Sequence, residues 1–389
     1  MIGIEDVRAA EERIRGRVRR TPVLRAGAQT FFKLEYAQHA GSFKTRGMMN
    51  QILASGPAPA AGIVVASGGN AGLAAAYAAR ELGIPAAVFV PETAPPVKVA
   101  KLGKLGAQVT QVGSEYAEAH AAAVVHAERT GARFCHAYDD PGMVAGNGTL
   151  GLELLDDLEF DTVLVAVGGG GLAAGVAAAL AGPAESADAG KGAGGSAGAG
   201  ESVGGSAGAG GDAGAGGSAG AGESVGGSAG AGGDAGAGGS AGAGKSAGGS
   251  AGAEGSAGAG AGTGARVTAG GKRVVAVEPE NCPTLSRALA AGEPVDVAVS
   301  GVAADSLGAR RIGLLPYQIA VLTEMRSLLV DDAAIVEARR RLWDDYRIVV
   351  EHGTAAAYAA LTSGVYRPAE GERVVVLLCG ANTNPGDLA

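Results

Sequence analysis

Short segments rich in β-branched residues alternate along this chain with longer alanine-rich segments, and glycines often stand at the junctions. The first kind predicts strands at Phe31–Glu35, Gly62–Ala66, Ala86–Val90, Gln108–Val112, Thr162–Val167, Arg273–Val277 and Arg373–Leu378. The second kind predicts helices, for example Ala71–Leu82, Glu115–Thr130 and Asp332–Tyr346. This order predicts an α/β fold in which helices cover parallel or mixed sheets. Ligands of such sheets bind where strands end, so we expect functional residues there.

A lysine follows the first predicted strand, in the segment GSFKTRG of residues 41–47. Lys44 lies where a helix is expected to begin, and both the helix dipole and partial burial disfavour a charged ammonium group there. A neutral amine is what a nucleophile that attacks a carbonyl carbon needs. Taken alone, the segment is better explained by an ordinary surface lysine beside Arg46.

Two glycine-rich turns each stand between a predicted strand and a predicted helix, at 67–72 (SGGNAG) and at 168–171 (GGGG). Backbone amides at a helix N-terminus form an anion site, so the first turn fits a carboxylate or phosphate as well as a plain turn. Four glycines allow several N–H groups to converge on one anion. Neither a P-loop lysine nor a G-x-G-x-x-G spacing is present, so the second turn favours a monophosphate.

Cys379 directly follows the last predicted strand, in the segment CGAN of residues 379–382. A thiol there fits a small core residue when it is taken alone. Its place at the same kind of strand end makes it a candidate site residue.

Between about Ala187 and Gly264 the chain is almost only Gly, Ala and Ser, and a 22-residue repeat begins at Gly200 and again at Gly222. Such a composition offers too few large apolar side chains to bury a core. We therefore predict a disordered, flexible insert (187–264) and expect catalysis to survive its removal. A silk-like or adhesive role is the alternative.

Charge and cysteine content limit the classes of partner. The net charge is −8 with no run of Lys or Arg, so no nucleic-acid partner is predicted. The N-terminus lacks an apolar leader, and four glycines interrupt the uncharged stretch Thr162–Ala184, which predicts strand, turn and helix rather than a membrane span. Three distant cysteines indicate reduced thiols and a cytoplasmic protein. The five histidines show no metal-ligand spacing and are expected to be structural.

In this order, the four segments resemble the serine/threonine dehydratase family of fold-type-II pyridoxal-phosphate enzymes, which are tryptophan synthase β-like. SFKTRG resembles the cofactor-lysine motif, SGGNAG the substrate-carboxylate loop and VGGGGL the phosphate loop. Weaker likenesses are VPETAPPVKVAKLGKLGAQV, AYDDPGMVAGNGT, VAVEPE and IVVEHGTAAAYAAL. The resemblance covers essentially the whole chain outside the insert. It implies a large domain of residues 1–46 and 146–389, a small domain of residues 47–145, and a homodimer.

The resemblance also implies roles for single residues. Lys44 would hold pyridoxal 5′-phosphate covalently and move the Cα proton of the substrate. Phe43 would pack against the pyridine ring, Asn70 would hydrogen-bond the 3′-oxygen, and Cys379 would face the ring nitrogen. The amides of Gly168, Gly169, Gly170, Gly171 and Leu172 would bind the phosphate. The substrate carboxylate would be bound by Ser67, Gly68, Gly69, Asn70 and Ala71.

The implied activity is β-elimination of L-serine and/or L-threonine to pyruvate or 2-oxobutanoate plus ammonia. A thiol is a weak donor that cannot keep the ring nitrogen protonated, which favours β-elimination over transamination. Racemases of the family usually have a second serine where this chain has Gly68, which argues against racemisation. Cys379 and the segment SGVAADSLGARRIG look more like the L-serine dehydratase branch. The chain ends ten residues after Cys379, without room for a regulatory domain, so we expect a catabolic role.

Glu278 matches the first ligand of the family's divalent site, but NCPTLSR downstream has no acid, so no metal is predicted. A monovalent cation held by backbone carbonyls stays open. Rival activities are those of another β-elimination or β-replacement enzyme of this fold, such as cysteine synthase, or of a lyase for another β-substituted amino acid. A non-catalytic carrier or an interaction protein built around the repeat is less favoured, because Lys44, Asn70, the glycine loop and Cys379 are intact.

Overall fold

The computed structural model describes residues 2–181 and 271–388; the predicted insert at 187–264 lies outside them. The described strands form two sheets, a six-stranded one in the order β1-β2-β10-β7-β8-β9 and a four-stranded one in the order β5-β4-β3-β6. They are β1 (Val23–Arg25), β2 (Thr30–Lys33), β3 (Ile63–Ala66), β4 (Ala86–Val90), β5 (Gln108–Gln111), β6 (Arg133–Phe134), β7 (Thr162–Ala166), β8 (Arg273–Pro279), β9 (Arg326–Val330) and β10 (Val374–Leu377).

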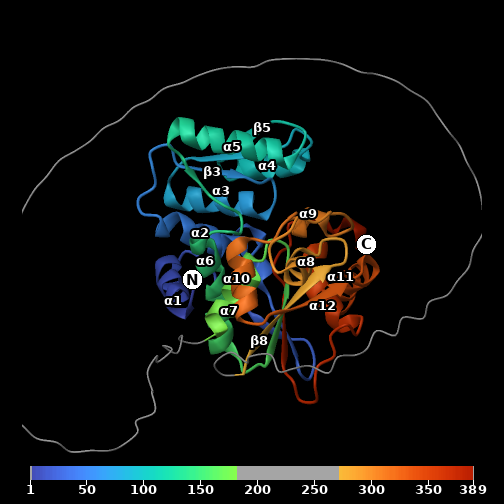
Figure 1. The fold of residues 1–389 in the computed structure, drawn as a ribbon. Helices are drawn as coiled ribbons and strands as arrows, with labels where there is room; N and C mark the ends of the chain where they lie inside the picture. The colour runs from blue at the N-terminus through green and yellow to red at the C-terminus, as the bar shows by residue number, and fades with distance from the viewer. Residues whose placement is uncertain (1, 182–270, 389) are drawn as a thin grey trace, which may run out of the picture. The chain divides into compact units, whose positions relative to one another are not determined.

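Helices surround both sheets (Figure 1). The described helices are α1 (Ile4–Ile14), α2 (Lys44–Ala54), α3 (Asn70–Leu82), α4 (Pro96–Lys104), α5 (Tyr116–Thr130), α6 (Pro141–Asp157), α7 (Gly171–Leu180), α8 (Thr284–Ala291), α9 (Ala304–Leu307), α10 (Leu314–Leu322), α11 (Asp332–Tyr346) and α12 (His352–Thr362). Short 3-10 turns are η1 (Glu35–Ala37), η2 (His39–Gly41) and η3 (Pro385–Asp387).

The four-stranded sheet is parallel throughout its described strands, and α3 and α5 pack against β3 and β4. All four residues of β3 are buried. Such burial is typical of a parallel strand that is covered by helices on both faces. In Figure 1 the helices α3, α4 and α5 accompany this sheet.

The six-stranded sheet joins distant parts of the chain. Strand β10, near the C-terminus, lies between β2 and β7 and is parallel to both, while β1 alone among its described strands is antiparallel. The loops that follow β2, β7 and β10 therefore leave the same edge of the sheet. These loops carry Lys44, the glycines at 168–171 and Cys379.

All seven predicted strands and the three predicted helices are confirmed, with small differences at their ends. The first strand stops at Lys33, because η1 begins at Glu35. The sequence analysis missed β1, β6 and β9. Strand β6 is two residues long, and the side chains of β1 are half-buried or exposed, so neither gives a clear apolar pattern.

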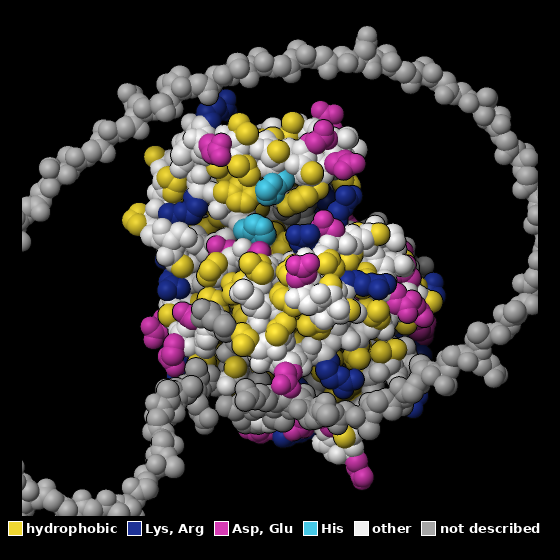
Figure 2. Space-filling view, viewed as in Figure 1, with side chains coloured by type: hydrophobic (Ala, Val, Ile, Leu, Met, Phe, Trp, Pro, Cys, Tyr) yellow, Lys and Arg dark blue, Asp and Glu magenta, His cyan; other side chains and the backbone are white. Residues whose placement is uncertain are grey.

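The uncharged stretch that begins at Thr162 forms β7, a glycine turn and α7, as predicted. Every residue of α7 is buried, in a core shared with β7, β8 and β10. Among the described residues, no helix combines the length and apolarity needed to cross a bilayer. On the face drawn in Figure 2, Lys and Arg side chains are scattered among acidic and apolar ones. The domain boundaries at residues 46–47 and 145–146 stay a prediction.

Candidate active site

The segment that carries Lys44 runs beside the segment that carries Cys379. Phe43 N–H donates to the carbonyl of Cys379 (3.0 Å), and Ser42 and Gly380 form a β-bridge. The bridge lies beyond the ends of β2 and β10 and is antiparallel, whereas the two strands pair in parallel. The contact brings the adjacent residues Phe43 and Lys44 beside Cys379, a predicted site residue far away in the sequence.

The amine of Lys44 is enclosed by backbone and aromatic groups. Its Nζ donates to the carbonyl of Ala137 (2.6 Å) and lies 5.0 Å and 6.0 Å from the ring centroids of Phe43 and Tyr138. Burial lowers the pKa of Lys44 to about 8, and Cys379 acts weakly in the opposite direction. An amine with this pKa is neutral in part at pH 7, where an ordinary lysine is almost fully charged.

The thiol of Cys379 is buried and stays neutral. Its Sγ lies 3.3 Å from Thr354 Oγ1, and this hydroxyl donates its proton to the carbonyl of Gly380 (2.9 Å). Since a hydroxyl has a single hydrogen, the thiol is the donor in its contact with Thr354. Burial raises the pKa of Cys379 to about 12.

The loop of residues 67–71 connects β3 to α3. Ser67 Oγ accepts a hydrogen bond from Gly69 N–H (3.3 Å), and the first bond of the helix runs from Leu73 N–H to Gly69 O (3.0 Å). The amides of Asn70, Ala71 and Gly72 therefore have no partner inside the helix and face its open N-terminal end. A Cβ at Gly72 would lie 1.9 Å from the carbonyl of Ser67, so this close approach requires glycine.

Asn70 connects this loop to two residues that the sequence analysis did not single out. Its Nδ2 donates to both carboxylate oxygens of Glu351 (3.0 and 2.9 Å), and its Oδ1 accepts from Asn382 Nδ2 (2.6 Å). Glu351 directly precedes α12, is buried, and has its pKa raised by that burial. The sequence signal was an acidic residue at the end of an apolar run in IVVEHG.

The four glycines at 168–171 form a close-packed turn between β7 and α7. Gly170 has φ +85°, and a Cβ at Gly169 would lie 2.3 Å from the ring of Tyr138. The first helical bond runs from Ala174 N–H to Gly170 O (3.0 Å), so the amides of Gly171 and Leu172 have no partner inside the helix. The turn is a backbone cradle with no room for side chains, and the buried side chain of Leu172 packs into the core.

Tyr138 is a further residue that sequence reasoning missed. Its ring is near both the Lys44 amine and the glycine cradle. The loop that carries it is held by His136, whose Nδ1 accepts from the N–H groups of Tyr138 (3.3 Å) and Asp139 (2.9 Å). A lone tyrosine in AYDDPG gave no signal for this position.

Glu278 caps α8 and contacts the glycine cradle through Thr284. Its carboxylate accepts from the N–H groups of Leu285 (2.7 Å) and Ser286 (2.8 Å) and from the hydroxyl of Ser327 (2.6 Å). Thr284 Oγ1 lies 3.1 Å from the same carboxylate and donates its single hydrogen to the carbonyl of Gly168 (2.5 Å). Three donors thus occupy the carboxylate considered as a first cation ligand. Within residues 2–181 and 271–388, no three His, Cys, Asp or Glu side chains are grouped to hold a metal ion.

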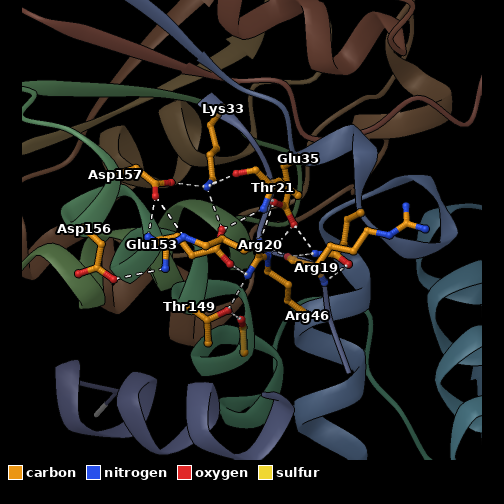
Figure 3. A network of polar contacts seen from close by, with 12 residues as sticks. Arg19, Arg20, Thr21, Lys33, Glu35, Arg46, Thr149, Glu153, Asp156 and Asp157 are labelled. Atoms are coloured by element: carbon orange, nitrogen blue, oxygen red, sulfur yellow. Dashed lines mark hydrogen bonds and ion pairs between the residues drawn. The ribbon is translucent and has the colours of Figure 1, made fainter. Parts of the chain in front are cut away.

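Behind Lys44, α2 is fixed by a buried network of charges (Figure 3). The guanidinium of Arg46 donates to Glu35 (2.6 and 3.0 Å) and to Glu153 (2.7 Å), and Lys33 donates to Glu153 (2.8 Å) and Asp157 (3.0 Å). Burial lowers the pKa of Arg46, but its carboxylate partners outweigh burial, so the net direction is upward. Arg46 is thus a buried anchor, not the neighbour of a surface lysine.

Comparison with known proteins gives one family and two groups of similar chains. The sequence model of the family described as "Pyridoxal-phosphate dependent enzyme" matches residues 14–192 and 250–380. An L-threonine ammonia-lyase of Geobacter sulfurreducens is 43% identical over 184 residues, which are 45% of this chain and 46% of that protein. One of Thermotoga maritima is 41% identical over 189 residues, 46% and 47% of the two chains. The match spans about half the length of these relatives.

Maize serine racemase and a threonine deaminase are among the solved structures that resemble this chain along its length. Maize serine racemase has a TM-score of 0.72 at 24% identity and covers 100% of this chain and 95% of its own. A T.th. threonine deaminase has a TM-score of 0.71 at 26% identity and covers 98% and 99%. The predicted fold type is confirmed.

Proposed function

The chain belongs to the pyridoxal-phosphate dependent enzyme family, and from that premise we propose that it eliminates water and then ammonia from L-serine and/or L-threonine. The products would be pyruvate or 2-oxobutanoate. The observation that carries this proposal is the pairing of the Lys44 segment with the Cys379 segment. It sets an amine with a pKa of about 8 beside a thiol with a pKa of about 12.

The described residues fit the cofactor that the family requires. The glycine cradle offers unpartnered amides at the N-terminus of α7, which suits a phosphate group. Phe43 and Tyr138 flank the Lys44 amine, and the buried hydroxyl of Ser42 has no hydrogen-bond partner among the described residues. We propose that Lys44, Phe43, Asn70, Cys379, Gly168, Gly169, Gly170, Gly171 and Leu172 hold the cofactor.

When bound, pyridoxal phosphate supplies an electron sink for the Cα–H bond of an amino acid. Lys44 Nζ is the base that takes the Cα proton, since its lowered pKa leaves part of the amine neutral at pH 7. The contact with Ala137 orients this nitrogen. Phe43 and Tyr138 restrict the access of water to the amine.

Cys379 favours elimination over transamination. A buried neutral thiol offers one weak hydrogen bond, already directed to Thr354, and brings no charge to the ring nitrogen it would face. Without a charged partner the ring nitrogen would make the cofactor a weaker electron sink, which would favour loss of the β-hydroxyl together with the Cα proton.

The loop of residues 67–71 is proposed to bind the substrate carboxylate. Its amides lie at the N-terminus of α3, and Ser67 Oγ adds a hydroxyl. Gly68 has no side chain to return a proton to the opposite face of Cα, and a Cβ there would already lie 3.2 Å from Val90. This supports an elimination enzyme over a racemase.

Elimination from another β-substituted amino acid, or β-replacement as in cysteine synthase, is the alternative function of this site. We further propose a homodimer in the cytoplasm, in line with the three free, buried cysteines. Exchange of potassium for a large organic cation in the assay tests whether the activity requires a monovalent cation.

The deciding experiment compares the wild-type chain with Lys44→Ala, and uses exposed Lys104→Ala on α4 as the control. We expect the visible absorbance of bound cofactor and 2-oxo acid release from L-serine and L-threonine in the wild type and control, and neither in Lys44→Ala. Cofactor absorbance without product from either substrate would favour the alternative. Absence of cofactor binding by the wild type would overturn the proposal.

A further inference from the structure

Asn382 lies at a junction between the two loops of the site, but the proposed function assigns it no part. Its Nδ2 donates to the carbonyl of Ala40 (2.7 Å), just before the lysine segment, and to Asn70 Oδ1 (2.6 Å) in the carboxylate loop. Its backbone N–H also hydrogen-bonds the carboxylate of Glu351, which accepts from Asn70 Nδ2. Asn382, Asn70 and Glu351 thus form a closed ring of hydrogen bonds.

The orientation of the two asparagine amides in this ring follows from the contact of Asn382 with Ala40. A backbone carbonyl can only accept, so the group that Asn382 turns toward Ala40 must be its NH2 group. The same NH2 group then requires an acceptor from Asn70, which is Oδ1. Asn70 is left with its own NH2 group directed away from Asn382, toward Glu351.

Glu351 alone does not determine this direction. Burial raises the pKa of Glu351, and a protonated carboxyl group has both a donor and an acceptor, so it matches either orientation of an amide. The carbonyl of Ala40 can only accept a hydrogen bond, so it matches a single orientation of the Asn382 amide. The backbone there is itself constrained, because Ala40 has φ +54° and a Cβ at Gly41 would lie 2.9 Å from Asn382 Oδ1.

We propose that Asn382 is a positioning residue that sets the amide orientation of Asn70, so that Asn70 presents hydrogen-bond donors rather than its oxygen. The consequence rests on the function proposed above, in which Asn70 helps to hold the cofactor, and on the bond from Asn70 to the cofactor's 3′-oxygen that the family resemblance implies. The two oxygens of one carboxylate lie close together, so a single N–H directed between them makes both contacts with Glu351, and the second N–H of Asn70 can donate elsewhere. If the Asn70 amide were reversed, its oxygen would face the oxygen of the cofactor that it is proposed to bind.

The first test does not need the cofactor. The chain has six asparagines, so side-chain amide signals can be followed after selective 15N labelling of the full chain. In Asn382→Asp the new carboxylate cannot donate to Ala40 or Asn70, and we expect the Asn70 amide protons to exchange with water at least tenfold faster. Unchanged exchange and chemical shift of the Asn70 amide would overturn the proposal.

Asn50→Asp is the matched control. The buried side chain of Asn50 also donates to a backbone carbonyl, that of Gly142 (2.7 Å), while its Oδ1 accepts from Arg13 (2.5 Å) on α1. Thermal unfolding measures what each variant loses in stability, and we expect pyridoxal-phosphate affinity to be reduced at least tenfold in Asn382→Asp alone. Equal affinities in the two variants would contradict the proposal.

A second variant decides the question if Asn382→Asp does not fold. In Asn70→Asp with Glu351→Gln, the carboxylate introduced at position 70 can accept from Asn382 and from the glutamine amide introduced at position 351. This keeps the ring bonded but removes the donors of Asn70. We expect a folded protein that binds pyridoxal phosphate at least tenfold more weakly, and wild-type affinity would overturn the proposal. If the wild type itself binds no pyridoxal phosphate, the proposed function fails, while the exchange experiment still tests the orientation.

Discussion

The amine of Lys44 donates a hydrogen bond to the backbone carbonyl of Ala137, 2.6 Å away and 93 residues further along the chain. The next residue, Tyr138, has its ring against the glycine cradle at Gly169. The contact between Lys44 and Ala137 therefore connects the N-terminus of α2 with the glycine turn that is proposed to hold a phosphate.

The lowered pKa of Lys44 predicts how capture of pyridoxal phosphate depends on pH. The neutral amine is the reactive form, so its fraction rises about tenfold per pH unit below pH 8 and levels off above it. An ordinary lysine would continue to gain reactivity up to about pH 10.4. Borohydride trapping of the cofactor on Lys44 between pH 6.5 and pH 10, followed by peptide mass analysis, measures the midpoint. A midpoint near that of an ordinary lysine would contradict the enclosed geometry.

The cysteines are predicted to be unreactive while the chain is folded. Burial raises the pKa of Cys135 and Cys379 to about 12 and also raises that of Cys282. Because only the thiolate is nucleophilic, we expect a coloured disulfide reagent at pH 8 to modify the folded protein at least tenfold more slowly than the unfolded protein, which should yield three thiols. Rapid modification of Cys379 in the folded state would show that it is accessible.

Adding one methyl group tests the glycine cradle. Gly169→Ala would bring a Cβ to 2.3 Å from the ring of Tyr138, and overpacking of this kind costs about 1–3 kcal/mol. We expect a lower unfolding midpoint and at least tenfold weaker cofactor binding. Gly103→Ala on α4 is the control, since nothing lies within 4 Å of its added Cβ; it should stabilise the protein by about 0.5–1 kcal/mol. Similar behaviour of the two variants would contradict the predicted crowding.

The buried network behind α2 predicts a difference between two substitutions of Arg46. Arg46→Met leaves the carboxylate of Glu35 without its cationic partner and leaves Glu153 paired with Lys33 alone, and breaking a buried pair in this way costs about 3–5 kcal/mol. Arg46→Lys keeps the charge but loses the two-pronged contact with Glu35, so we expect a smaller loss. Denaturant unfolding measures both. Arg341→Met removes the exposed pair with Glu337 and should shift the midpoint far less; equal shifts would mean that burial of Arg46 has no energetic consequence.

The sequence alone indicated the elements and the local chemistry of the site. Alternation of strand and helix predicted seven strands, and glycine-rich turns before helices identified the two candidate anion sites. Lys44 and Cys379 stood out because each follows a strand. These predictions rest on physics that acts within about ten residues, namely apolar periodicity, helix N-termini and the conformational freedom of glycine.

Contacts between distant segments were beyond the sequence. Nothing in residues 374–377 indicated that β10 would lie between β2 and β7, yet this order is what places Cys379 beside Phe43. The partners Glu351, Asn382 and Tyr138 were missed for the same reason. Glu278 matched a cation ligand in sequence, whereas the fold engages its carboxylate with α8 and Ser327.

The sequence therefore determined which residues of this protein can carry chemistry, and the tertiary structure decided which of them meet and in what state. A lysine has an ordinary pKa until the fold buries it, and the orientation of an amide has no meaning until its partners are in place. Both depend on desolvation and on strand order, which arise only when segments far apart in the chain pack together.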